Sequence, residues 1–225
     1  MQLDGGDGEV HDAAMPGDPA TPPEARPFRP AVPVVLGLLG GVAAGKSTVA
    51  ATFAAYGLCR IDADEVARTV SSEAPVLQSI AAAFGPAVVR GGALDRPAMA
   101  AVVFRDPAAR ARLEAILHPP IRARILAGLA AAKARGDSVL LDVPLLLENG
   151  LIAECDHVVF VHAADATRRA RAAARGWSPD ELARREAAQA PLAEKRRRAA
   201  FTVDNDADLA TMRAAVAAVL QAISP

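Results

Sequence analysis

Short apolar runs alternate with longer segments of helical character along most of the chain. The first run, residues 34–39, is apolar throughout and stops at two glycines, which is typical of a strand buried on both faces of a parallel sheet. Further short runs predict strands at residues 58–61, 138–141, 157–161 and 201–203. Because strands and helices alternate at both ends of the chain, the pattern predicts an α/β fold with a five-stranded parallel sheet and right-handed crossovers.

The segments between these runs predict helices, and three of them begin at a proline suited to a first helical turn: Pro97, Pro120 and Pro179. The predicted helices span residues 47–56, 63–70, 75–84, 97–104, 108–117, 120–135, 166–175, 179–188, 192–199 and 209–223. The long helical stretch between the second and third strands exceeds a simple crossover. It therefore predicts an all-helical insertion beside the sheet.

The loop between the first strand and the first helix matches the pattern G-x-x-x-x-G-K-[ST] at every fixed position. Its residues are Gly40, Gly41, Val42, Ala43, Ala44, Gly45, Lys46, Ser47 and Thr48. Glycine lets main-chain N–H groups approach phosphate oxygens, and the helix N-terminus adds partial positive charge. Lys46 would reach the β- and γ-phosphates of ATP, and the Ser47 hydroxyl would bind Mg²⁺. The alternative is a tight glycine-rich turn with no ligand.

The phosphate loop and the order of strands and helices together predict three folded parts and a tail. Residues 33–64, 138–165 and 200–225 form a nucleotide-binding core, residues 65–137 a substrate-side helical insertion, and residues 166–199 a helical lid. Residues 1–30 are rich in Gly, Pro, Asp and Glu, so they predict a disordered acidic tail.

Composition and charge exclude several partners. The 225 residues carry a formal net charge of −1, which gives no basic field for a nucleic acid. No apolar run reaches about 18 residues, and the chain does not open with the charged segment and apolar run of a signal peptide. We therefore expect no membrane partner and a cytoplasmic location. We expect a monomer or a weak homo-oligomer.

Missing motifs narrow the class of phosphate-binding protein. Neither asparagine precedes a lysine, so the N-K-x-D guanine-reading motif is absent, and no L-S-G-G-Q, H-R-D or D-F-G occurs. Small GTPases, transporter ATPases and protein kinases are therefore excluded.

Two aspartates, Asp62 and Asp64, end the second predicted strand. Ligands of open parallel sheets lie at the carboxyl ends of the strands, so a carboxylate here can face the γ-phosphate and act as a base toward a hydroxyl group. Either aspartate could instead cap the helix that follows. Asp142 ends the third strand and could bind Mg²⁺, or simply form a turn before Val143-Pro144.

Arginines gather on the helix after the fourth strand, where Arg171 and Arg175 share one face. Guanidinium groups suit the charge that spreads over the oxygens of a transferring phosphoryl group, so this helix predicts a lid that closes over ATP. A solvated basic face is the alternative. The run Lys195 to Arg198 is interpreted as such a solvated face, with a phosphate-facing residue as the alternative.

Several motifs occur together in one order: G-G-V-A-A-G-K-S-T, I-D-A-D-E-V-A-R, L-D-R, L-E-A-I-L-H-P-P-I, V-P-L-L-L-E-N-G-L, R-x-x-x-R, A-A-Q and V-D-N. This series resembles the dephospho-CoA kinase family over residues 34–220. The sequence departs from the family at Leu39, where threonine is usual, and at Ala44, where serine is common. Neither side chain is needed for a cradle built from main-chain groups.

The resemblance implies a P-loop kinase that uses ATP and Mg²⁺ and phosphorylates the ribose 3′-hydroxyl of dephospho-CoA. It implies that Asp64 is the catalytic aspartate and that Arg171 contacts phosphate. His118 and Asp62 would lie on the substrate side, and Asn205 and Arg175 beside the nucleotide. His118 could instead end a helix before Pro119, and Asn205 could be a turn residue. The alternative functions are a kinase for another small acceptor, such as a nucleoside monophosphate, and a nucleotide-binding module without turnover.

Overall fold

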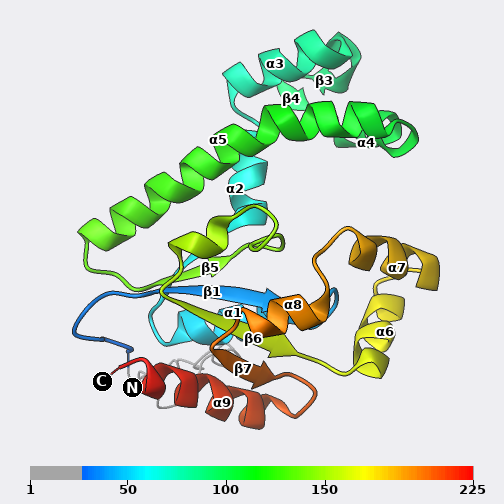
Figure 1. The fold of residues 1–225 in the computed structure, drawn as a ribbon. Helices are drawn as coiled ribbons and strands as arrows, with labels where there is room; N and C mark the ends of the chain where they lie inside the picture. The colour runs from blue at the N-terminus through cyan, green and yellow to red at the C-terminus, as the bar shows by residue number, and fades with distance from the viewer. Residues whose placement is uncertain (1–26, 225) are drawn as a thin grey trace, which may run out of the picture.

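The computed structural model describes residues 27–224, and a five-stranded parallel sheet forms its centre (Figure 1). The strand order is β2-β5-β1-β6-β7. The strands are β1 (Val35–Gly40), β2 (Cys59–Asp62), β5 (Val139–Asp142), β6 (His157–His162) and β7 (Phe201–Asp204). The α/β class, the five strands and their parallel pairing are confirmed.

The apolar run of β1 is explained by its central position between β5 and β6, in register with both. Its side chains alternate between two cores. Leu36 and Leu38 pack with α1 (Lys46–Ala55) and α9 (Leu209–Ala222), which lie together on one face of the sheet in Figure 1. Leu39 packs on the other face, against α5 (Pro107–Ala134).

The insertion has a small core of its own, built from Val70, Val76, Ile80, Val88 and Met99. Its elements before α5 are α2 (Ala63–Val70), α3 (Ala74–Phe84), η1 (Pro86–Val88), β3 (Val89–Arg90), β4 (Ala93–Leu94) and α4 (Arg96–Arg105).

The prediction that this insertion is all-helical is wrong, because β3 and β4 form an antiparallel hairpin. Gly91 and Gly92 make its two-residue turn with positive φ angles of 57° and 76°. A two-residue type I′ turn needs positive φ at both positions, so the Gly-Gly pair in the sequence was the signal for the hairpin.

The prediction of two helices that meet at Pro120 is also wrong. Helix α5 runs without interruption through Pro119 and Pro120, neither of which begins a helix. An interior proline removes a main-chain hydrogen bond and usually breaks a helix. Here the helix is held on both sides of the prolines. Leu113 and Leu117 pack into the insertion core, while Ile125 and Leu129 pack on the sheet.

The region of the predicted lid contains α6 (Asp165–Ala174), α7 (Pro179–Ala187) and α8 (Leu192–Arg197), and η2 (Leu151–Glu154) precedes β6. In Figure 1, α6 and α7 project beyond the ends of β1 and β6. Val42 and Ala43 of the phosphate loop pack with Ala172 and Leu182 of these helices.

Most of the predicted acidic tail, residues 1–30, lies outside the described residues. Where the structure begins, Phe28 donates its N–H to the Tyr56 carbonyl at 2.7 Å. Its side chain packs against the core that the sheet forms with α1 and α9. Residues 27–30 therefore belong to the folded part. None of the helices within residues 27–224 is long and apolar enough to cross a membrane.

We predict that Gly37→Ala destabilises the protein. A Cβ atom at this position in β1 would lie 2.6 Å from Cys155 Sγ and 2.7 Å from Leu146 Cδ2, and such overpacking costs about 1–3 kcal/mol. The matched control is Gly128→Ala in α5, whose added Cβ meets only the flexible end of Ile61, at 3.3 Å. Urea unfolding measures both free energies. Equal midpoints for the two variants would contradict the prediction.

Candidate active site

The phosphate loop turns from β1 into α1 through two residues with left-handed backbone angles, Ala43 (φ 59°) and Gly45 (φ 84°). Ala43 is the one non-glycine residue with a positive φ among residues 27–224. The Lys46 ammonium bends back and donates to the Gly41 carbonyl at 3.3 Å. The loop thereby surrounds the N-terminus of α1, which is a favourable position for an anion.

Burial lowers the pKa of Lys46, and the nearby Lys195 ammonium lowers it further. Asp142 and Glu148 oppose this shift. Lys46 forms no ion pair with any described residue, whereas Lys195 pairs with Glu148. An anionic ligand at the loop is therefore favoured, because its oxygens would supply the negative charge that Lys46 lacks.

Asn205 and Arg171 stabilise the loop through hydrogen bonds to its carbonyl groups. The buried Asn205 amide donates to the Ala44 carbonyl at 2.8 Å and to the Gly45 carbonyl at 3.4 Å. Arg171 donates to the Ala44 carbonyl at 3.0 Å and to the Asn205 carbonyl at 2.7 Å. Both side chains, which the resemblance assigns to ATP, therefore contact loop carbonyls and are absent from the lining of the main cavity described below.

A cavity of about 750 Å³ opens in front of the loop. It is bounded by the loop itself, the carboxyl ends of β2 and β5, one end of α4, and the lid. The charged residues that line it are Lys46, Arg60, Asp62, Asp64, Arg110, Asp142, Arg175, Glu181, Arg184 and Arg185. A cavity of this size and charge can hold a nucleotide together with part of an acceptor.

The carboxylates in this cavity have different surroundings. Asp62 caps α2, accepting from the N–H groups of Asp64 and Glu65 at 2.8 and 3.2 Å. Arg60 ties Asp62 to its strand neighbour Asp142, at 2.7 and 2.6 Å. The exposed Asp64 carboxylate has no hydrogen bond or ion pair with any other described residue. Asp62 is thus the capping residue, and Asp64 is left free to accept a proton.

The arginines of the lid divide into two groups. Arg168 is buried and pairs with Asp165 and Glu186, so it supports the lid from within. Arg175 and Arg185 lie against the Trp177 ring, 5.6 and 4.2 Å from its centre, and both line the cavity.

Sequence reasoning missed four cavity arginines: Arg60, Arg110, Arg184 and Arg185. The last two form an Arg-Arg pair on a helix that the sequence placed in the predicted lid without singling out its arginines, so that pair was the available signal.

Lys195 is buried, with 1% of its surface exposed, so the interpretation as a solvated face is wrong for this residue. Arg196, Arg197 and Arg198 are exposed, as that interpretation expected. The Lys195 ammonium donates to Gln189 Oε1 at 2.7 Å and lies 3.4 Å from Glu148 Oε1. Helix α8 turns this one residue inward, while Arg197 and Arg198 pair with Glu194 on the exposed side. The buried cation thus joins the end of the lid to the segment after β5.

His118 is exposed and lies on α5, away from the main cavity. It lines two smaller cavities, one on each side of this helix.

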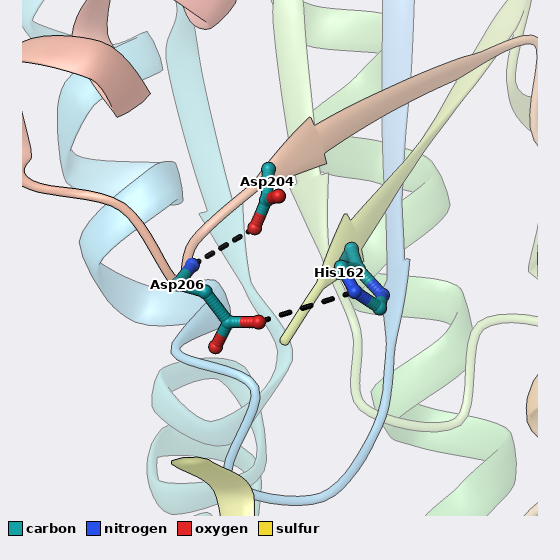
Figure 2. A group of neighbouring side chains, drawn as sticks. All are labelled: His162, Asp204 and Asp206. Atoms are coloured by element: carbon teal, nitrogen blue, oxygen red, sulfur yellow. Dashed lines mark hydrogen bonds and ion pairs between the residues drawn. The ribbon is translucent and has the colours of Figure 1, made fainter. Parts of the chain in front are cut away.

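A cluster of three side chains stands where β6 and β7 end (Figure 2). Asp206 accepts from the Ala164 N–H at 2.5 Å and lies 3.9 Å from His162 Nε2, while its own N–H donates to Asp204 at 2.9 Å. The bond from Ala164 lowers the pKa of Asp206. Ala164 is the N-cap of α6, so this carboxylate fixes the start of the lid.

The phosphate loop between β1 and α1, the parallel sheet, the free carboxylate at the end of β2 and the arginine-bearing lid define a P-loop kinase. The family model of dephospho-CoA kinase matches residues 34–211. The chain belongs to the dephospho-CoA kinase family.

A curated relative supports this assignment, and solved structures share the fold. The dephospho-CoA kinase of Deinococcus radiodurans is 46% identical over 197 residues, which cover 87% of this chain and 95% of the relative. A crystal structure from Thermus thermophilus superposes with a TM-score of 0.72 at 34% identity, covering 86% of this chain and 100% of that one. The dephospho-CoA kinase of Campylobacter jejuni shares the fold, with a TM-score of 0.66 at 24% identity over 84% of this chain and 96% of that one.

We predict that Asn205→Ala raises the KM for ATP several-fold, because the loop loses a buried hydrogen bond worth about 1 kcal/mol. Asn205→Asp keeps the shape of the side chain but removes its donors, so it should be at least as damaging. Steady-state kinetics with each substrate varied measure both effects. The KM for the acceptor should stay within twofold. An unchanged KM for ATP in both variants would show that the hydrogen bonds from Asn205 to the loop are unimportant.

We predict that Lys195→Met lowers the free energy of unfolding by about 3 kcal/mol, because Gln189 and Glu148 lose the buried cation that they contact. Arg196→Met is the control: Arg196 is exposed on the same helix, and such surface changes usually stay within about 0.5 kcal/mol. Chemical denaturation followed by circular dichroism compares them. A loss in the Arg196 variant as large as in the Lys195 variant would refute this account.

Proposed function

We propose that this protein transfers the γ-phosphate of ATP to the ribose 3′-hydroxyl of dephospho-CoA, giving coenzyme A and ADP in the last step of coenzyme A synthesis. One observation carries the chemistry: the Asp64 carboxylate, free of partners among the described residues, lines the same cavity as the complete phosphate loop. The family assignment supplies the acceptor.

ATP would bind with its phosphates against the loop N–H groups and Lys46. Ser47 and Asp142 both line the cavity and offer hard oxygen donors of the kind that Mg²⁺ prefers. Arg60 pairs with one oxygen of Asp142, and the second oxygen remains available to a cation. A bound Mg²⁺ would offset charge on the phosphates.

In the transfer step, an Asp64 oxygen accepts the proton of the 3′-hydroxyl as that oxygen attacks the γ-phosphorus. The bond from the γ-phosphorus to the bridging oxygen breaks, and ADP leaves with the electron pair. Lys46 stabilises the charge that develops on the transferring group. Asp62 supports the base indirectly, because it caps the helix turn that carries Asp64.

The lid would supply the remaining cations. Arg175, Arg184 and Arg185 already face the cavity, so they can approach the phosphates with little movement of α7. Arg171 donates to the carbonyls of Ala44 in the loop and of Asn205 just after β7, so in this conformation it positions the loop and does not face the phosphates directly.

We place this reaction in the cytoplasm, with small-molecule partners, no nucleic acid, and a monomeric or weakly associating protein. The formal net charge of −1 supports the absence of a nucleic-acid partner.

We predict that Asp64→Asn lowers kcat with dephospho-CoA by about 10²–10⁴, because the amide cannot accept the hydroxyl proton. The KM for ATP should change little, since Asp64 lies on the acceptor side. Glu65→Gln is the matched control: Glu65 is the exposed neighbour on the same helix turn and does not line the cavity.

A coupled assay of ADP release measures both variants beside the wild type. Wild-type turnover with a nucleoside monophosphate but not with dephospho-CoA would reject the proposed acceptor. An Asp64→Asn enzyme with more than half of the wild-type kcat would reject the proposed base. ATP binding without turnover of any acceptor would favour a binding module.

A further inference from the structure

Gln189 lines the main cavity but has no part in the transfer step described above. It lies in the short segment between α7 and α8, where the chain returns from the lid to the sheet (Figure 1). Its side chain is half-buried, and among the described residues that line this cavity it carries the one side-chain amide. An amide can both accept and donate a hydrogen bond, so its orientation decides what it can do in the cavity.

The buried Lys195 ammonium fixes the orientation of this amide. Lys195 Nζ lies 2.7 Å from Gln189 Oε1, and because an ammonium group can only donate, the amide oxygen is the atom turned toward it. Glu148 lies 3.4 Å from the same ammonium and accepts from the Ala190 N–H at 2.7 Å. The carboxylate therefore holds both the ammonium and the backbone next to Gln189.

The nitrogen of the Gln189 amide is the atom left over for a ligand. The oxygen and the NH2 group branch from one carbon, so an oxygen bound to Lys195 turns the NH2 group away from it. Among the described residues, none accepts a hydrogen bond from this NH2 group. Because the side chain lines the main cavity, its two N–H donors are available to a ligand there.

Helix α8 brings this segment close to the start of the phosphate loop. A Cβ atom added to Gly41 would lie 3.1 Å from Leu192 Cδ2, so the first turn of α8 packs directly on the loop. The Lys46 ammonium lies at the same place, 3.3 Å from the Gly41 carbonyl oxygen. In loops of this type the lysine reaches the β- and γ-phosphates. Gln189, three residues before Leu192, therefore approaches the cavity from the side of the terminal phosphate.

We propose that the Gln189 side-chain amide donates a hydrogen bond to the γ-phosphate of ATP, and that Lys195 is the positioning residue that holds the amide in this orientation. The inference rests on the proposed function, because it takes ATP to bind at the loop. A donor aimed at an anionic oxygen forms a strong hydrogen bond, and a donor that is already oriented needs no rearrangement during the transfer. Lys195 acts through Gln189, since it is buried and does not itself line the cavity.

The test separates the donor of this amide from its acceptor. Gln189→Glu keeps the length of the side chain and an oxygen for Lys195, but replaces the NH2 group with a second oxygen that repels phosphate. Gln189→Met keeps the length and removes both groups without adding charge. Gln221→Glu is the matched control, because Gln221 is exposed on α9 and does not line the main cavity.

We predict that Gln189→Glu lowers kcat with dephospho-CoA by about 10²-fold or more, as expected for a lost donor to a reacting group, and that Gln189→Met lowers it by about tenfold. Calorimetry should show a Kd for the non-hydrolysable ATP analogue AMP-PNP about tenfold higher in Gln189→Glu. The Kd for ADP, which lacks the γ-phosphate, should change by much less. The urea midpoint of Gln189→Glu should match the wild type, because Lys195 keeps its acceptor. Gln221→Glu should match the wild type throughout.

The positioning role of Lys195 has its own readout. Lys195→Met should weaken binding of AMP-PNP more than binding of ADP, a selectivity that a general loss of stability would not produce. Adding Gln189→Met to this variant should lower kcat little further, because the amide has already lost its fixed orientation. An equal effect of Lys195→Met on the two nucleotides would reject this role.

Wild-type kcat and wild-type affinity for AMP-PNP in Gln189→Glu would overturn the proposal, because the amide would then serve only to hold Lys195. Equal weakening of AMP-PNP and ADP would also overturn it, since the contact would not be with the γ-phosphate. Failure of the proposed function is distinguishable. The wild type would then not turn over dephospho-CoA, whereas the two nucleotide binding constants do not depend on the acceptor.

Discussion

The active site depends on a loop whose backbone is held open by contacts from distant parts of the chain. Ala43 and Gly45 take left-handed angles, and for a residue with a side chain this conformation costs about 1 kcal/mol or more. Asn205 and Arg171 offset that cost by hydrogen-bonding to the loop carbonyls, and Val42 and Ala43 pack against the lid. The Ala44 and Gly45 carbonyls are thereby engaged by protein donors, which leaves the loop in the conformation that the proposed phosphate binding needs.

The same arrangement explains the distribution of charge. Cations surround the cavity on three sides: Lys46 in the loop, Arg110 on the insertion, and Arg175 with Arg185 on the lid. Arg60 pairs with both Asp62 and Asp142, so its single positive charge offsets part of their negative charge at the strand ends. Asp64 alone of these three keeps an unpaired carboxylate among the described residues, which is consistent with the proposed role as a base.

Helix α5 connects the insertion to the sheet. One half of it packs in the insertion core and the other half on the sheet, so the insertion is positioned by the same element that covers the sheet. On the lid side, Lys195 and Asp206 perform a similar task. The first joins the end of the lid to Glu148, and the second fixes the start of α6 through Ala164. Both ends of the lid are therefore anchored, and α7 lies between the anchors.

The sequence by itself determined the strands, the parallel sheet, the phosphate loop and the family. These features depend on local chemistry: apolar runs, glycines at a turn, and residue types at fixed spacing. Tertiary structure decided which of Asp62 and Asp64 caps the helix, because Arg60 and the N–H groups of α2 select Asp62.

Tertiary structure also decided that Lys195 is buried and that α5 continues through two prolines, since both outcomes depend on packing between residues far apart in the chain. A single sequence lists the charged residues but does not show which of them are in contact. Those contacts, which depend on the tertiary structure, define the candidate site.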